Sequence, residues 1–223
     1  MPVSPAQLGA AAAEAVQAGA GAVHFHVRGV DGRESLAATD VARAVAEVRR
    51  HGMPFGISTG AWIIADPARR LAVVEEWTVL TDFVSINFDE AGAAEHAGVL
   101  LRRIVGLEAG VANPFAAEQL VWSGLGNRCL RIMFEPREQV VGDAMATVAA
   151  TEAVLDAAAV RTPRLLHGVH ATAWPLVDAA GARGYGTRIG FEDTLTLPSG
   201  EVAGGNGELV RAALARLAGA AST

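Results

Sequence analysis

Two histidines on one face of a short strand are the residues of this chain best suited to chemistry. His24 and His26 lie in a run from Gly21 to Gly29 in which β-branched and aromatic residues dominate, a pattern typical of a β-strand. Alternate side chains of a strand share a face, so the two imidazoles project together, about 7 Å apart along the strand. Two core histidines are the plainer interpretation, but a same-face pair favours a metal site.

A second group of reactive side chains lies near the end of the chain. Arg188, Gly190 and Glu192 share one face if residues 187–191 form a strand. Glu192 can then be the third ligand of a His, His, Glu zinc site, which leaves one coordination position for a substrate. Asp193 follows at the turn, where it could act as a base oriented by Arg188. A buried Arg–Glu pair with a purely structural role is the alternative.

Further polar side chains occur where the middle strands are expected to end. Ser58, Thr59 and Gly60 offer two hydroxyls and an unhindered backbone, which suit a carboxylate or a polarised carbonyl, although such a tripeptide also marks turns. Polar side chains that are buried need hydrogen-bond partners or a function. This applies to Ser85, Asn87 and Glu108, and also to Glu135, His167 and His170, for which no role is assigned.

Short apolar strands alternate with helices along the whole chain. We predict strands at Ala22–Val27, Phe55–Ser58, Phe83–Phe88, Val105–Glu108, Leu130–Phe134, Leu165–Val169 and Thr187–Phe191. Helices are predicted at Gln7–Ala18, Val41–Arg50, Pro67–Glu76, Ala94–Arg103, Ala116–Gly124, Asp143–Ala158, Trp174–Ala180 and Gly207–Leu217.

Repeated βα units imply parallel strands with helical crossovers, so we predict an α/β fold of the TIM (β/α)8 type as a single domain over residues 1–223. Such a barrel needs eight strands and the sequence supplies seven. The strand without a counterpart is the first, which should precede the opening helix. Either it lies upstream, or the barrel is open there and two strand edges need another cover.

Composition narrows the classes of function. Of 223 residues, 51% are hydrophobic and 19% charged, which indicates a folded chain, and the net charge of -6 argues against nucleic-acid binding. All 18 basic residues are arginines, so a lysine Schiff base is excluded. The single cysteine, Cys129, cannot form an internal disulfide, and the first residues do not resemble a signal peptide. We expect a cytoplasmic protein.

Taken in order, several short motifs resemble those of one enzyme family, the β-keto acid cleavage enzymes, often labelled 3-keto-5-aminohexanoate cleavage proteins. The resemblance covers about Pro5 to Val210 and rests on His24-x-His26-x-Arg28, Asp31-Gly32-Arg33, Ser58-Thr59-Gly60, Ser85-x-Asn87, Glu108 and Arg188-x-Gly190-x-Glu192-Asp193.

The resemblance implies a zinc-dependent TIM barrel that condenses a β-keto acid with acetyl-CoA to give acetoacetate and a new CoA thioester. Position by position, it implies zinc on His24, His26 and Glu192, and Asp193 as the base, oriented by Arg188 and Glu108. Ser58, Thr59, Gly60, Ser85 and Asn87 match positions that hold the substrate. A homotetramer is implied as well.

Three departures from the family pattern bear on activity. Relatives begin with a strand that carries a glutamate, often have asparagine where this chain has Thr194, and have a glycine-rich loop around His170. A truncated, non-catalytic relative is therefore one alternative. The other is an amidohydrolase-type metal hydrolase, which also uses a His-x-His strand and a late aspartate. That class usually adds a lysine or further histidines, whereas the middle strands here carry Ser, Asn and Glu.

Overall fold

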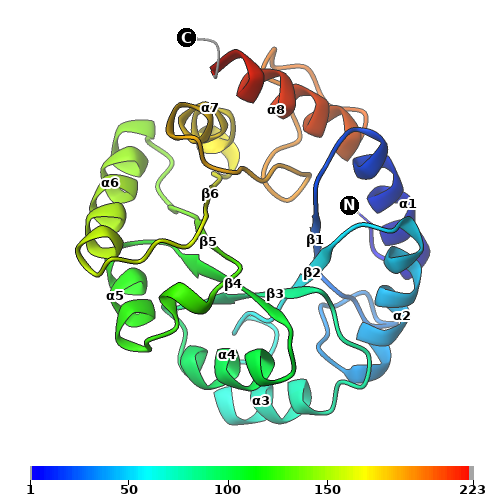
Figure 1. Ribbon diagram of the computed structural model, residues 1–223. Helices are drawn as coiled ribbons and strands as arrows, with labels where there is room; N and C mark the ends of the chain where they lie inside the picture. Colours follow the sequence, from blue (N-terminus) through cyan, green and yellow to red (C-terminus); the bar gives the residue numbers. More distant parts are fainter. Residues whose placement is uncertain (1, 221–223) are drawn as a thin grey trace.

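The computed structural model describes residues 2–220; Met1 and residues 221–223, the two ends of the predicted domain, lie outside the described residues. Six parallel strands form one curled sheet in chain order within this part of the chain (Figure 1). They are β1 (Val23–Phe25), β2 (Phe55–Ser58), β3 (Phe83–Asn87), β4 (Gly106–Val111), β5 (Arg131–Phe134) and β6 (Arg164–Leu166). The first six predicted strands are thus confirmed, with β1 and β6 shorter than predicted and β4 extending further, to Val111.

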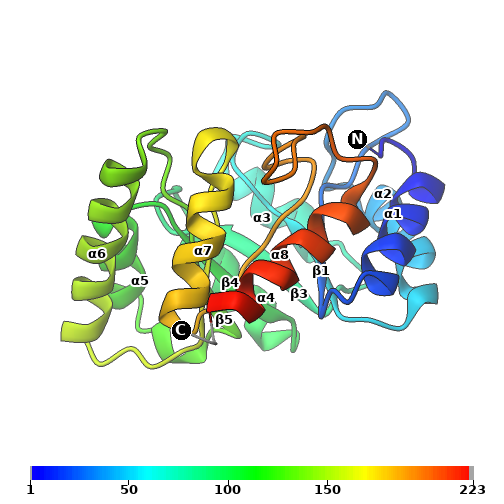
Figure 2. The ribbon, with the colours of Figure 1, turned by 90° about the horizontal axis from the view of Figure 1, so that it is seen from above.

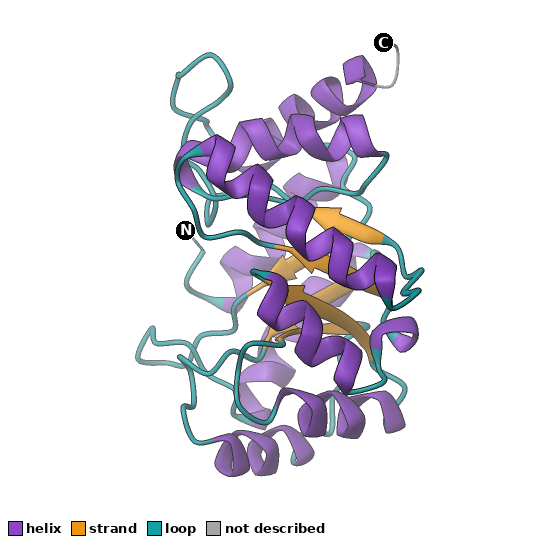
Figure 3. Ribbon diagram, turned by 90° about the vertical axis from the view of Figure 1, so that its left-hand side faces the viewer, coloured by secondary structure: helices purple, strands orange, loops and turns teal. Residues whose placement is uncertain are grey.

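Helices surround the strands on their outer side (Figure 3). They are α1 (Pro5–Gln17), α2 (Ala38–Val48), α3 (Pro67–Glu75), α4 (Ala93–Arg102), α5 (Pro114–Trp122), α6 (Val141–Ala157), α7 (Ala173–Arg183) and α8 (Asn206–Ala220). Local sequence explains where several begin. Ser4 and Gln7 form a capping box at α1, and the Asp66 carboxylate accepts a hydrogen bond from the Arg69 N–H at the start of α3.

The two faces of the sheet carry different side chains. Ile57, Val84 and Leu107 point outward into the apolar core against the helices. On the inner face, Ser58, Ser85 and Glu108 are register partners on β2, β3 and β4, and Glu108 is the partner of Arg131 on β5. Parallel pairing therefore lines up one polar row across four strands.

The predicted seventh strand, Thr187–Phe191, is wrong. Only Gly186 makes a parallel bridge to Leu165 of β6, and the chain then turns, with the N–H groups of Asp193 and Thr194 donating to the Gly190 carbonyl. Farther along, the Phe191 N–H donates to the side chain of Asn206 instead of to a strand. This segment has a strand neighbour on one side at most, so no ladder forces it to stay extended.

The sheet is consequently a partial TIM-like barrel, and the complete eight-stranded barrel is not what the structure shows. β1 pairs with β2 on one side and with no described strand on the other. We call the space between β1 and residues 186–193 the open seam, and the strands β2–β5 the closed wall. Outside the seam, α8 lies between α7 and α1 and contacts both (Figure 2).

A cavity of about 600 Å³ fills the open seam. Apolar side chains of α1 and α8 form its outer part, and His24, Arg188 and Glu192 lie at its polar end. No helix in the described part of the chain is both long and apolar enough to cross a membrane.

Candidate active site

The predicted metal ligands converge at the end of β1. One ligand atom from each of His24, His26 and Glu192 lies within 4.8 Å of the others. The two imidazole rings are 5.4 Å apart between centroids, and Phe25 points the other way, where it stacks on Phe55. His26 lies just beyond the strand, yet it keeps the same-face geometry that the alternation predicts.

The hydrogen bonds around His24 fix which ring nitrogen is free. Its Nδ1 lies 3.1 Å from the Ser85 hydroxyl, which donates its own proton to Glu108 in a short hydrogen bond. The hydroxyl must therefore accept from Nδ1–H, because it has only one proton to give. This tautomer leaves the lone pair of Nε2 for a metal.

His26 is oriented in the same way by a residue that the sequence analysis missed. Its Nδ1 lies 3.0 Å from Glu34 Oε2, which also accepts a 2.7 Å hydrogen bond from Trp62 Nε1. A carboxylate behind a histidine ligand is the usual arrangement that fixes ring orientation in metal sites. Asp31-Gly32 was the available signal: it predicts a tight turn, and the chain does fold back there, with Glu34 bridging Arg28.

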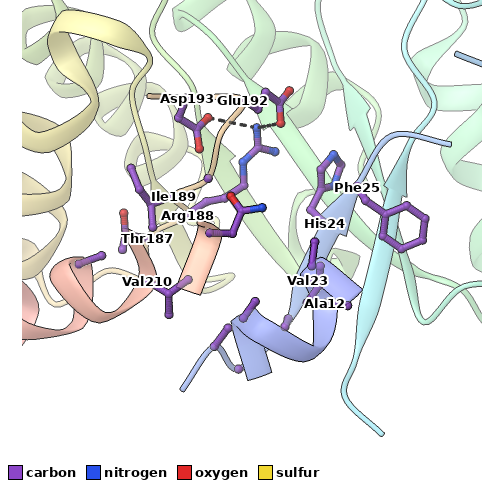
Figure 4. A pocket seen from close by; sticks show the side chains of 18 of the residues that line it. Ala12, Val23, His24, Phe25, Thr187, Arg188, Ile189, Glu192, Asp193 and Val210 are labelled. Atoms are coloured by element: carbon purple, nitrogen blue, oxygen red, sulfur yellow. Dashed lines mark hydrogen bonds and ion pairs between the residues drawn. The ribbon is translucent and has the colours of Figure 1, made fainter. Parts of the chain in front are cut away.

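Glu192 reaches the histidines from the open seam. Its Oε1 lies 3.2 Å from His26 Nε2, and its Oε2 accepts a 3.0 Å hydrogen bond from Arg188. The same Arg188 Nη2 atom lies 3.6 Å from Asp193 Oδ1. Figure 4 marks both contacts of Arg188 with dashed lines. Arg188, Glu192 and Asp193 therefore form one cluster beside the two histidines, although their segment is not a strand.

Burial and charge set the protonation states of this cluster. Burial, together with the neighbouring charges of Arg188 and His26, lowers the pKa of His24 well below its usual value. Burial acts to raise the pKa of Glu192, but the His26 hydrogen bond and Arg188 outweigh it and hold that pKa low. Burial acts to lower the pKa of His26, but the carboxylates of Glu192 and Glu34 outweigh it and raise that pKa. A neutral imidazole and an ionised carboxylate are the forms that bind a metal, so metal binding would displace the proton that these carboxylates favour on His26.

The residues present thus fit a divalent metal such as zinc. The donor set is two imidazoles and one carboxylate, and each imidazole is oriented through Nδ1 by a hydrogen-bond partner.

Beside the metal ligands lies a smaller cavity of about 260 Å³ that collects most of the predicted substrate-binding residues. Ser58, Ser85 and Asn87 line it together with His24, His26, Glu192 and Arg188. Asn87 donates to Glu90 at 3.2 Å, and Gly110 on the next strand leaves room for it, since a Cβ there would overlap the amide. The larger cavity in the open seam has a more apolar lining overall, but Asp193 lines that cavity and not the smaller one, and His24, His26, Arg188 and Glu192 line both.

Thr59 and Gly60 do not line the smaller cavity. The buried Thr59 hydroxyl donates to the Ser85 carbonyl at 2.9 Å, and so ties β2 to β3. Gly60 leaves space for Trp62, whose ring stacks on His26 at 5.9 Å between centroids. Both residues therefore hold neighbouring parts of the site in place and do not line the cavity.

Among the described residues, the contacts of Glu108 are with other side chains than Asp193, which it was expected to orient. It pairs with Arg131 and accepts the proton of Ser85, and its Oε1 lies 4.0 Å from His24 Nδ1. The strand register explains this placement, because Glu108 sits inside β4 instead of at its end. Its contacts connect it to the metal ligand His24.

Comparison with solved structures shows the fold alone. A thiamine phosphate pyrophosphorylase from Pyrococcus furiosus aligns with a TM-score of 0.56 at 10% identity over 96% of this chain and 90% of that one. A 3-dehydroquinate dehydratase from Aquifex aeolicus VF5 aligns with a TM-score of 0.55 at 14% identity, over 97% and 95%. Among curated proteins, no significant match is found.

Sequence comparison with protein families identifies the group. The family described as beta-keto acid cleavage enzyme matches residues 1–222, essentially the whole chain. Its members act on β-keto acids, which agrees with a polar cavity beside a candidate metal site. This chain belongs to the beta-keto acid cleavage enzyme family.

Proposed function

We propose that the protein is a zinc-dependent acyltransferase that condenses a β-keto acid with acetyl-CoA and releases acetoacetate and a new CoA thioester. One observation carries the proposal: His24, His26 and Glu192 converge, with Asp193 and Arg188 beside them, in a chain of this family. The finer points, zinc and acetyl-CoA, rest on the resemblance and on the chemistry of these groups.

His24, His26 and Glu192 would hold the metal. When bound there, zinc supplies a Lewis acid that polarises the keto group of the substrate. Ser85 and Glu34 keep the two imidazoles oriented, as their hydrogen bonds indicate.

Asp193 is the proposed base. It would remove a proton from the carbon between the keto and carboxylate groups, since that proton is the most acidic one in such a substrate. Arg188 lies against Oδ1 of Asp193 and would hold the carboxylate in place. Ser58, Ser85 and Asn87 offer the hydroxyl and amide donors to bind the substrate carboxylate. Thr59 and Gly60 would act behind them.

The resulting carbanion attacks the acetyl carbonyl of acetyl-CoA. A C–C bond forms to the acetyl group and CoA leaves as the thiolate. The thiolate then attacks the original keto carbon, the old C–C bond breaks, and the carbanion that is released takes back the proton held by Asp193. The products are acetoacetate and the CoA thioester of the remaining acyl group, so atoms and charge balance without an oxidant or a reductant.

A screen of β-keto acids with acetyl-CoA tests the proposal. The purified protein, loaded with zinc, should form acetoacetate and CoA thioester in equal amounts, and a chelator-treated sample should not. Absence of acetoacetate with every β-keto acid, from a sample that contains one zinc per chain, would instead favour the non-catalytic relative. The open seam makes that outcome worth testing. Hydrolysis of amide or ester substrates would point to the amidohydrolase-type alternative.

Self-association is part of the same proposal. The family resemblance implies a homotetramer, and α5 presents the exposed apolar side chains Phe115 and Trp122 as a surface for a second copy. Light scattering on the purified protein measures the assembly directly, and a monomer at micromolar concentration would contradict it.

A further inference from the structure

A buried histidine that the proposed reaction does not use lies behind Asp193. His167 follows β6, and its side chain is fully buried. Its backbone N–H donates to the Phe134 carbonyl at 3.1 Å. Its Nδ1 lies 3.3 Å from Asp193 Oδ1, and its Nε2 lies 3.6 Å from Glu135 Oε2. The imidazole therefore stands between two carboxylates.

The backbone next to His167 braces Asp193 a second time. The His170 N–H donates to the Asp193 carbonyl at 2.7 Å. His170 has a φ of +52°, in the left-handed region that non-glycine residues rarely adopt. The loop keeps this unfavourable backbone conformation where it hydrogen-bonds to Asp193, which indicates that the surrounding contacts hold it there.

The charges around the imidazole favour its protonated form. Burial and Arg188 act to lower the pKa of His167, but the carboxylates of Asp193 and Glu135 outweigh them and raise it to about 9. An imidazolium at neutral pH gives Asp193 a second cation. Both cations, Arg188 and His167, lie against the same oxygen, Oδ1.

We propose that His167 is a positioning residue that holds the Asp193 carboxylate by Oδ1 and leaves Oδ2 to receive the substrate proton. This inference rests on the proposed function and deepens it, because it explains how a base on an irregular segment keeps a fixed orientation. A histidine that merely filled the core would have apolar neighbours around both ring nitrogens, whereas here each nitrogen faces a carboxylate.

Steady-state kinetics of His167→Asn test the positioning role. We expect kcat to fall by about 10–100-fold while KM and zinc content stay unchanged, because the variant keeps the substrate and metal sites. His96→Asn is the matched control, since His96 is a buried histidine of α4 outside the site. A wild-type kcat in His167→Asn would overturn the proposal, and so would a joint loss of kcat, zinc and folded structure that His96→Asn does not show.

A second measurement does not depend on turnover. Long-range ¹H–¹⁵N spectra of the folded protein at pH 7 should show both His167 ring nitrogens protonated. Glu135→Gln, at a partly exposed position, should lower the pKa of His167 in the same spectra without unfolding the chain. If no β-keto acid is turned over, the proposed function fails. These spectra still decide whether a protonated His167 lies between the carboxylates of Asp193 and Glu135. A neutral His167 at pH 7 would overturn the inference on its own.

Discussion

The closed wall and the open seam hold their polar side chains in different ways. In the wall, Ser58, Ser85, Glu108 and Arg131 are fixed in one row by the strand register. In the seam, Arg188, Glu192 and Asp193 lie on an irregular segment, where Arg188 pairs with both carboxylates. His26 and His167 pair with Glu192 and Asp193 from other segments. The reactive groups thus gather where backbone pairing ends and side-chain contacts take over. Substitutions on the two sides should therefore have different consequences.

The largest effect is expected where wall and seam meet. His24→Ala removes one of three candidate ligands and should abolish binding of about one zinc per chain, together with turnover. Metal analysis of the purified variant measures the loss. His51→Ala, in the 3₁₀ turn Arg49–His51 after α2, is the matched control and should keep its metal. Full zinc content in His24→Ala would remove His24 from the ligand set.

The next effect concerns the seam alone. Asp193→Asn keeps the size of the side chain but removes the base, so kcat should fall by about 10²–10⁴-fold with zinc retained. Steady-state kinetics and metal analysis on the same sample provide the test. Asp178→Asn breaks an ion pair with Arg216 on the outer helices and should leave kcat unchanged. Turnover at the wild-type rate would exclude Asp193 as the base.

A smaller change, in zinc affinity, is expected from the residue that orients the candidate ligand His26. Glu34→Gln keeps the shape of the side chain but loses the charge that orients His26, so zinc affinity should weaken by about 10–100-fold. Competition with a zinc chelator measures this. The control is Glu47→Gln, whose carboxylate pairs with Arg50 on the surface. Equal affinity in both variants would mean that Glu34 does not orient the ligand.

The smallest effects are expected from changes in packing, in the closed wall on one side and in the open seam on the other. Ala109→Leu adds volume to the closed wall, where Ala109 is fully buried, and should lower the free energy of unfolding by about 1–3 kcal/mol. Residue 12 on α1 lines the cavity of the open seam, so Ala12→Leu has room for the larger side chain. We expect this variant to lower the free energy of unfolding by less than about 1 kcal/mol. Urea titrations of both variants give the difference. Equal destabilisation would show that the seam is as tightly packed as the wall.

Prediction from sequence was most complete where local signals are strong. Short apolar runs rich in β-branched and aromatic residues predicted the six strands, and the capping residues Ser4 and Asp66 lie at the starts of two predicted helices. The alternation of side chains along a strand placed His24 and His26 on one face. The seventh strand was predicted by the same pattern and was wrong, because a strand also needs a neighbour and residues 187–191 have too little backbone pairing to stay extended.

The sequence by itself determined the chemical types at the site and their order, and the match to the family shows that this information was sufficient to identify the group. Only the tertiary structure decided which side chains contact one another. It put Glu34 behind His26, Glu108 beside His24 instead of Asp193, and His167 between Asp193 and Glu135. Residue periodicity reports the face of one strand, whereas contacts between segments far apart in the chain depend on register, turns and ion pairs.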